Sequence, residues 1–143
     1  MVTELMCMAF AVYYEAGNQP LEVQFMVADS VMGRIATKSP EFTDGTICGT
    51  VHKGYAKGRW PMIAPKLDNP IDALAWKQAQ AVAYAKKDGV SPNIADGVIF
   101  FHSRKTEEGV EIKPYWAYAD YVCYGGKQDA FWWYKLCGEK YEN

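Results

Sequence analysis

Residues 13–24 contain the end of one predicted helix, a turn and the start of a second helix, and they read Tyr13-Tyr14-Glu15-Ala16-Gly17-Asn18-Gln19-Pro20-Leu21-Glu22-Val23-Gln24. Gly17 is a natural helix stop and Asn18 tolerates turn geometry. Pro20 suits the first position of the following helix, because it has no N–H to leave unpaired. The stretch therefore predicts a helical hairpin with the carboxylate of Glu15 beside the connecting turn.

The two helices of this hairpin are expected at residues 3–16 and 20–36, with Thr3 as N-cap of the first. Apolar residues recur at steps of three and four along one face of each. These are Leu5, Met8, Ala9, Val12 and Ala16 in the first helix, and Leu21, Phe25, Ala28, Met32 and Ile35 in the second. A third helix is expected from Asn69, a capping residue, to Gly89, with the apolar face Ile71, Leu74, Ala75, Ala79, Val82 and Ala85.

Glycine and proline interrupt the pattern between residues 37 and 69, where 46–51 fits either a short helix or a strand. After residue 92 the period changes to two, which predicts strands at 97–103, 116–124 and 131–136, the last two separated by Gly125-Gly126. Helices first and strands last indicate an α+β fold. We expect the N-terminal helical hairpin and the third helix to pack with a small C-terminal antiparallel β-sheet, with a cleft between them.

Length, composition and charge limit the classes to which the chain can belong. Its 143 residues, 50% hydrophobic and 22% charged, fit one globular domain with its own core. A net charge of −2 argues against a nucleic-acid binder, since the one basic cluster is Lys53, Lys57 and Arg59. No apolar run reaches the roughly 18 residues that span a bilayer. The apolar N-terminus carries Glu4 and lacks a basic region, so a signal peptide is not expected.

Four cysteines, Cys7, Cys48, Cys123 and Cys137, form no Cys-x-x-Cys pair. With only two histidines in the chain, a zinc site would need scattered residues, and we expect neither a metal nor another cofactor. We interpret the cysteines as buried thiols. The alternative is that Cys123 and Cys137 pair across neighbouring strands.

Glu15 is the side chain best suited to chemistry, because nucleophile motifs and glycine-rich phosphate loops are absent. It falls in the last turn of a predicted helix, where the helix dipole disfavours a negative charge. Tyr13 and Tyr14 beside it can also exclude water. Both effects favour the protonated acid that glycan cleavage needs to protonate its leaving oxygen. The alternative is a solvated glutamate at a helix end.

The same stretch resembles the motif Y-x-E-A-R-G-E-P-x-x-G-Q-x-x-V-A-x-V-x-x-N-R of the cell-wall hydrolase family typified by the spore cortex-lytic enzyme SleB, which includes small phage lysins. The matching residues follow in order over roughly residues 5–134. They are 13–16, 20–24, Val27-Ala28, Arg34, 46–51, Trp60, the helix around 76–85, Phe101-His102 and 114–117. The chain departs from the motif at 17–19, at Val23, which replaces a glycine, and at Gly33, which replaces an asparagine.

The resemblance implies a single catalytic domain over residues 1–143, with no separate wall-binding module, that cuts the MurNAc-GlcNAc β-1,4 bond of peptidoglycan. It implies Glu15 as the catalytic acid, and a glycan contact formed by Gln24, Trp60, His102 and Trp116. For His102 and Trp116 the alternative is a structural role in the sheet or core. A hydrolase needs a second carboxylate, for which Glu22, Asp96 and Asp120 are candidates only. A lytic transglycosylase needs one acid, and it is the outcome that we expect.

We further expect a monomer that acts on peptidoglycan strands, binds no nucleic acid and does not insert into membranes. Without a signal peptide, such a protein is made in the cytoplasm and reaches the wall by phage lysis or virion delivery. Two other functions compete with this one. The motif residues lost at Gln19 and Gly33 suit a non-catalytic glycan-binding or virion structural protein that retains the fold. A zinc amidase or peptidase is the third interpretation.

Overall fold

Helices α1 (Glu4–Ala16) and α2 (Leu21–Ala36) form the predicted hairpin in the computed structural model, which describes residues 3–55, 68–90, 94–95, 97–103 and 115–137. The side-chain oxygen of Thr3 accepts a hydrogen bond from the N–H of Met6 at 3.1 Å and caps α1. α1 ends at Ala16, and the N–H of Gly17 donates to the Tyr13 carbonyl at 2.9 Å. Pro20 is the N-cap of α2 and not its first residue.

The stretch left open at 46–51 is helical, because it begins α3 (Ile47–Gly54). Two side chains satisfy the first N–H groups of this helix. Thr46 accepts from the N–H of Gly49 at 2.9 Å, and the carboxylate of Glu4 accepts from the N–H groups of Ile47 and Cys48. The negative charge of Glu4 thus lies at the positive end of the α3 dipole and holds α3 against the start of α1.

The third predicted helix is α4 (Pro70–Lys87), and the Asn69 side chain accepts from the N–H of Asp72 at 2.8 Å, as expected of a cap. Its predicted apolar face is partly wrong. Ile71 and Leu74 are 80% and 68% exposed, whereas Trp76 and Ala83 are buried. The ring of Trp76 meets Tyr13 of α1 edge-on at 5.5 Å, so the face of α4 that packs on α1 runs through Trp76, Ala79 and Ala83.

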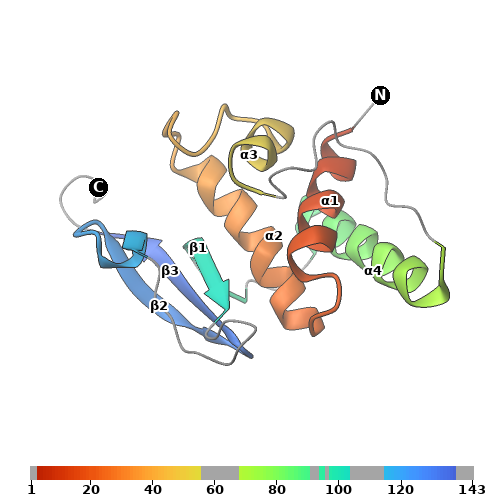
Figure 1. The fold of residues 1–143 in the computed structure, drawn as a ribbon. Coiled ribbons are helices and arrows are strands. Elements are labelled where there is room, and N and C mark those ends of the chain that lie inside the picture. The colour runs from red at the N-terminus through yellow and green to blue at the C-terminus, as the bar shows by residue number, and fades with distance from the viewer. Residues whose placement is uncertain (1–2, 56–67, 91–93, 96, 104–114, 138–143) are drawn as a thin grey trace.

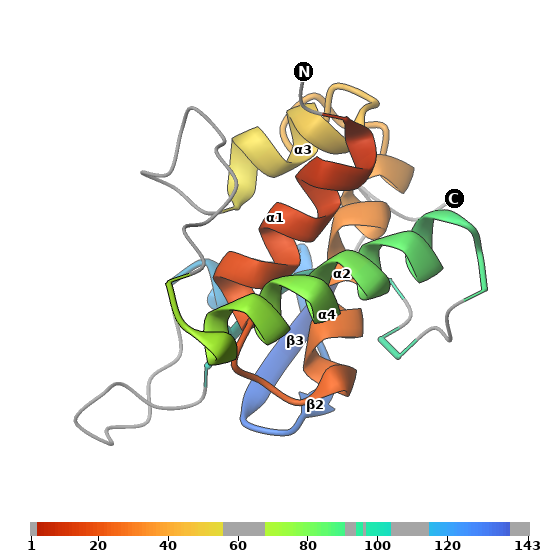
Figure 2. The same cartoon turned by 90° about the vertical axis from the view of Figure 1, so that its right-hand side faces the viewer.

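The predicted apolar face of α2 is also only partly right, since Ala28 is buried and Phe25 and Ile35 pack against the core, whereas Leu21 and Met32 are exposed. α2 lies in the middle of the molecule, with α1 and α4 on one side and the β-sheet on the other (Figure 1). In the view of Figure 2, α4 crosses in front of α1, and the sheet lies behind α2. Because α2 is covered from more than one side, it buries nearly every residue from Val23 to Val31 and has no single apolar stripe.

The three strands β1 (Val98–Ser103), β2 (Val122–Gln128) and β3 (Phe131–Leu136) form an antiparallel sheet of order β1-β3-β2. The strand predicted at 116–124 is wrong over its first half, because residues Tyr115–Tyr118 form the short 3₁₀ helix η1. The predicted separator is wrong as well. β2 continues through Gly125-Gly126, and the chain turns at Asp129, which has a φ of 52°.

The packing of Trp133 explains why Gly125 and Gly126 lie inside a strand. A side chain at Gly125 would collide with the six-membered ring of Trp133, and a Cβ at Gly126 would lie 3.0 Å from its Nε1. The register of β2 against β3 shifts between Tyr124 and Gly126. The glycine pair therefore makes room for an indole ring at a β-bulge, and this tertiary demand overrides its local preference for a turn.

A buried ion pair connects α2, α4 and the segment before β1. The carboxylate of Asp29 pairs with the ammonium of Lys86 and accepts from the N–H groups of Ile94 and Ala95, at 2.9 and 3.1 Å. Both side chains are less than a tenth exposed. The pair fixes the approach to β1 relative to the helices.

All four cysteines are in disulfides, so their interpretation as buried thiols is wrong. Cys7 of α1 is bonded to Cys48 of α3, with Cα atoms 5.1 Å apart. Cys123 is bonded to Cys137, with Cα atoms 5.9 Å apart, which confirms the alternative for that pair. Among the described residues, no helix has both the length and the apolar composition needed to cross a bilayer.

Candidate functional site

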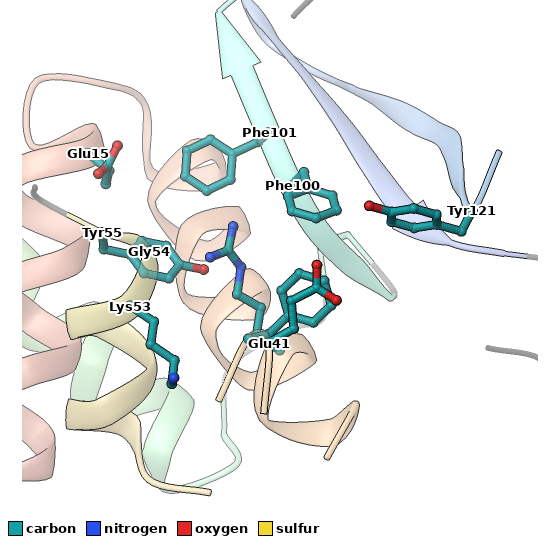
Figure 3. A pocket seen from close by; sticks show the side chains of 10 residues that line it. Glu15, Glu41, Lys53, Gly54, Tyr55, Phe100, Phe101 and Tyr121 are labelled. Atoms are coloured by element: carbon teal, nitrogen blue, oxygen red, sulfur yellow. The ribbon is translucent and has the colours of Figure 1, made fainter. Parts of the chain in front are cut away.

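A cavity of about 490 Å³ lies between the helices and the sheet, where the fold predicts a cleft (Figure 3). The described residues that line it come from α1, α2, α3, β1 and the loops that follow α2, α3 and η1. They are Glu15, Arg34, Glu41, Phe42, Lys53, Gly54, Tyr55, Phe100, Phe101 and Tyr121. The cavity thus combines two carboxylates, two cationic groups and several aromatic rings.

Glu15 lies in the last turn of α1 and is half-buried. In Figure 3 its carboxylate lies on the helical side of the cavity, and Phe101 reaches toward the cavity from β1. Tyr13 and Tyr14 pack edge-on against each other at 4.9 Å beside it, and Ala16 is buried. These contacts hold the end of α1 in place and leave the carboxylate at the cavity wall.

Tyr55 is one of the residues that line the cavity, and it is only 1% exposed. Its hydroxyl and that of Ser30 are 2.5 Å apart and share a hydrogen bond. Burial raises the pKa of Tyr55, Arg34 and the Ser30 hydrogen bond oppose this, and the negative charge of Glu15 raises it further. The pKa of the Tyr55 phenol therefore depends on the charges of both Glu15 and Arg34.

Arg34 of α2 is held firmly at the cavity. Its Nε donates to the carbonyl of Ile99 at 2.8 Å, and its guanidinium carbon lies 4.8 Å from the ring centre of Tyr55 and 5.3 Å from that of Phe100. Gly54 allows this arrangement, because a Cβ there would collide with Nη1 of Arg34. The cation is fixed by one hydrogen bond and two aromatic faces.

Glu41 is a cavity residue that the sequence analysis did not single out. It lies in the loop after α2, and Figure 3 shows it apart from Glu15, with the side chain of Tyr55 between them in this view. Of the earlier candidates for a second carboxylate, Glu22 and Asp120 do not line the cavity, and Asp96 is outside the described residues. Because a loop residue has no periodic signal in the sequence, the position of Glu41 in the same cavity as Glu15 is seen only in the folded structure.

Gln24 does not reach the cavity, although the resemblance implies a substrate contact there. Its side chain is fully buried, and its Nε2 donates to the Gln19 carbonyl and to Oε1 of Gln78, both at 3.1 Å. Among the described residues its own Oε1 has no hydrogen-bond partner. Gln24 ties the turn after α1 to α4, which is a structural role.

His102 lies on the sheet but not at the cavity. Its ring stacks on Tyr134 of β3 at 5.5 Å, and its Nε2 is 3.0 Å from the hydroxyl of that tyrosine. These contacts agree with the alternative that His102 has a structural role in the sheet. Trp116 belongs to η1, but its side chain is outside the described part, and Trp60 lies outside it altogether. Their predicted contacts with glycan stay predictions.

In the described ranges, no group of three or more His, Cys, Asp or Glu side chains is arranged to hold a metal ion. Since every cysteine is in a disulfide, none is available as a thiolate ligand.

The chain matches no protein-family model, no curated protein and no solved structure. The likeness to the SleB-type hydrolases thus rests on the motif residues alone.

Proposed function

We propose that this protein cleaves the MurNAc-GlcNAc β-1,4 bond of peptidoglycan, with Glu15 as general acid and base. The observation that carries the proposal is the position of Glu15, which lies in the last turn of α1 at the wall of a cavity between the helices and the sheet. The cavity volume, about 490 Å³, is in the range of small-molecule sites. The rings of Phe100, Phe101 and Tyr121 in its lining suit the apolar faces of sugars.

The reaction we favour is that of a lytic transglycosylase. Glu15 donates its proton to the bridging oxygen, and the bond between that oxygen and C1 of the muramic acid breaks. The 6-hydroxyl oxygen of the same sugar then bonds to C1, and its proton passes to Glu15. One product ends in a free 4-hydroxyl and the other in a 1,6-anhydro ring, so a single carboxyl group suffices.

Hydrolysis is the second candidate, and the presence of Glu41 in the same cavity favours it. Glycosidases that use water need two carboxyl groups, one to protonate the leaving oxygen and one to activate the water or attack C1. In that reaction Glu41 would serve as the second group. Water would then enter the product, which would carry a new reducing end.

The test is digestion of purified sacculi, with mass spectrometry of the fragments released. We expect the native protein to release anhydro-muramyl fragments, and Glu15→Gln to slow release at least about 100-fold, because the amide cannot donate the proton. Glu22→Gln is the matched control, since Glu22 is exposed and does not line the cavity. If Glu15→Gln digested sacculi as fast as Glu22→Gln, Glu15 would not be the acid.

Glu41→Gln separates the two reactions. A transglycosylase would keep its anhydro products and most of its rate, whereas a hydrolase would lose its rate and its reducing-end products together. A protein that bound sacculi but released nothing soluble would instead be the non-catalytic glycan-binding or structural protein.

We also propose that the protein acts outside the reducing cytoplasm, on the wall. Its two disulfides, Cys7–Cys48 and Cys123–Cys137, support this, because such bonds persist in oxidising compartments.

A further inference from the structure

We propose that Arg34 forms a carboxylate-binding subsite inside the Glu15 cavity, and that the acidic group it takes is carried by the lactyl arm of muramic acid. This inference rests on the proposed function and adds to it the part of the substrate that the cavity recognises. Three features of Arg34 support this subsite: its guanidinium is held in advance, its outer nitrogens have no acceptor among the described residues, and it borders the cavity.

The guanidinium is held through its Nε and by two aromatic rings. Nε donates to the Ile99 carbonyl at 2.8 Å, and the rings of Tyr55 and Phe100 flank the cation at 4.8 and 5.3 Å. Gly54 has no side chain to push Nη1 away. Because this geometry exists before any ligand arrives, little conformational entropy is lost when the remaining N–H groups bind an anion.

Neither Nη1 nor Nη2 has a hydrogen-bond acceptor among the residues that the structure describes. Within the same ranges, no carboxylate lies at ion-pair distance from Arg34, although Glu15 and Glu41 line the same cavity. A guanidinium has five N–H donors in a planar fork that matches the two oxygens of a carboxylate. Lys53, which also lines the cavity, adds a second positive charge to attract the ligand.

The chemistry of the glycan indicates where such a carboxylate would come from. GlcNAc is neutral, whereas muramic acid carries a lactyl ether that ends in a carboxyl group. In a bare glycan strand this carboxyl is free and ionised. In peptide-bearing strands it forms an amide with the stem peptide, and the next carboxylates belong to that peptide. Either source would present a carboxylate on an arm beside the bond that Glu15 is proposed to break.

The experiment measures binding, so that it does not depend on cleavage. The Glu15→Gln protein is titrated calorimetrically with three ligands: bare glycan strands, the same strands with their carboxylates converted to methylamides, and strands that retain the stem peptide. Since a hydrogen bond to a charged group stabilises by roughly 1.5–3 kcal/mol, we expect the carboxylate form to bind about 10- to 100-fold more tightly than the methylamide form. Tighter binding of the bare strands identifies the lactyl carboxylate, and tighter binding of the peptide strands identifies the stem.

Two further variants in the Glu15→Gln background complete the design. Adding Arg34→Gln should abolish the preference, whereas adding Lys127→Gln, which removes a charge from an exposed residue outside the cavity, should preserve it. The comparison of ligands on an unaltered Arg34 protects the test against misfolding of the arginine variant. Equal affinity for the carboxylate and methylamide strands, or binding to neither, would overturn the subsite.

Cleavage by the native protein separates this inference from the proposed function. If the native protein cuts both forms equally well, the role of Arg34 is wrong and that of Glu15 stands. If it cuts neither, while the Glu15→Gln protein prefers the carboxylate strands through Arg34, the subsite stands and the cleavage proposal is wrong.

Discussion

Gly33 allows strand β1 to lie directly against helix α2. A Cβ at this position would collide with the carbonyl oxygen of Val98, which is backbone and cannot turn aside. The close approach of β1 therefore leaves no room for a side chain at position 33. Since Phe100 and Phe101 of β1 line the cavity, this one missing side chain influences the shape of the site.

We predict that Gly33→Ala lowers the free energy of unfolding by about 1–2 kcal/mol. Overpacking against β1 costs about 1–3 kcal/mol, and alanine returns up to about 1 kcal/mol through its higher helix propensity. Urea denaturation measures the difference. Met32→Ala, on an exposed position of the same helix, should change the free energy by no more than about 0.5 kcal/mol. A stabilising Gly33→Ala would show that β1 is not in close contact with α2.

Tyr55 should make the protein sensitive to alkali. Burial raises its pKa above the ordinary value of 10.0, so above about pH 10 the unfolded chain loses the phenolic proton while the folded chain keeps it. The stabilisation from neutral Tyr55 is complete below about pH 10, and it is lost as the pH rises through the raised pKa.

We therefore predict that the free energy of unfolding falls as the pH rises above about 10, and that it falls less steeply in Tyr55→Phe. Phenylalanine cannot ionise, although it also loses the hydrogen bond to Ser30 and so lowers stability at every pH. Urea denaturation across this range measures both slopes. Equal slopes for the two proteins would mean that Tyr55 does not contribute to the pH dependence.

At the level of the helices and strands, the two disulfides differ in what they hold together. Cys7–Cys48 connects α1 to α3 across a sequence separation of 41 residues. Cys123–Cys137 spans 14 residues and connects β2 to the residue that follows β3. The hydrogen bonds between β2 and β3 already hold these two segments together. The first bond therefore restricts the unfolded chain more than the second.

We predict that Cys7→Ser with Cys48→Ser lowers the free energy of unfolding by about 3–4 kcal/mol, and that Cys123→Ser with Cys137→Ser lowers it by about 1 kcal/mol less. The difference follows from the entropy of closing a longer loop. Chemical denaturation of the two double variants under identical conditions tests the order, and a reversed order would contradict the argument.

The elements that could be predicted from the sequence are those with local signals. Thr3 and Asn69 are caps, and Gly17 and Gly89 follow helices, so α1, α2 and α4 appear close to their predicted bounds. The errors come from tertiary packing. Gly125-Gly126 accommodates Trp133 and does not form a turn, and α2 is buried on several sides, so its apolar spacing does not mark one core face.

At the scale of the whole molecule, the candidate site could be predicted only in part. The motif and the helix end both pointed to Glu15, which lines the cavity. Arg34 stands out in the sequence only as a motif residue, Glu41 has no pattern of its own, and Tyr121 falls in a predicted strand but lies in the loop before β2. Gln24 shows the opposite error, because its motif position implied a glycan contact and its side chain is buried against Gln78.

The order in which the cavity is put together during protein synthesis follows from where its residues lie in the sequence. A ribosome-bound chain extended as far as Tyr55 already contains Glu15, Arg34 and both members of the Cys7–Cys48 bond. It does not yet contain Phe100, Phe101 or Tyr121, which form the sheet side of the cavity. Every nascent or truncated chain that stops short of β1 therefore carries the acid without the opposite wall, and the complete cavity exists only once the C-terminal sheet has been made.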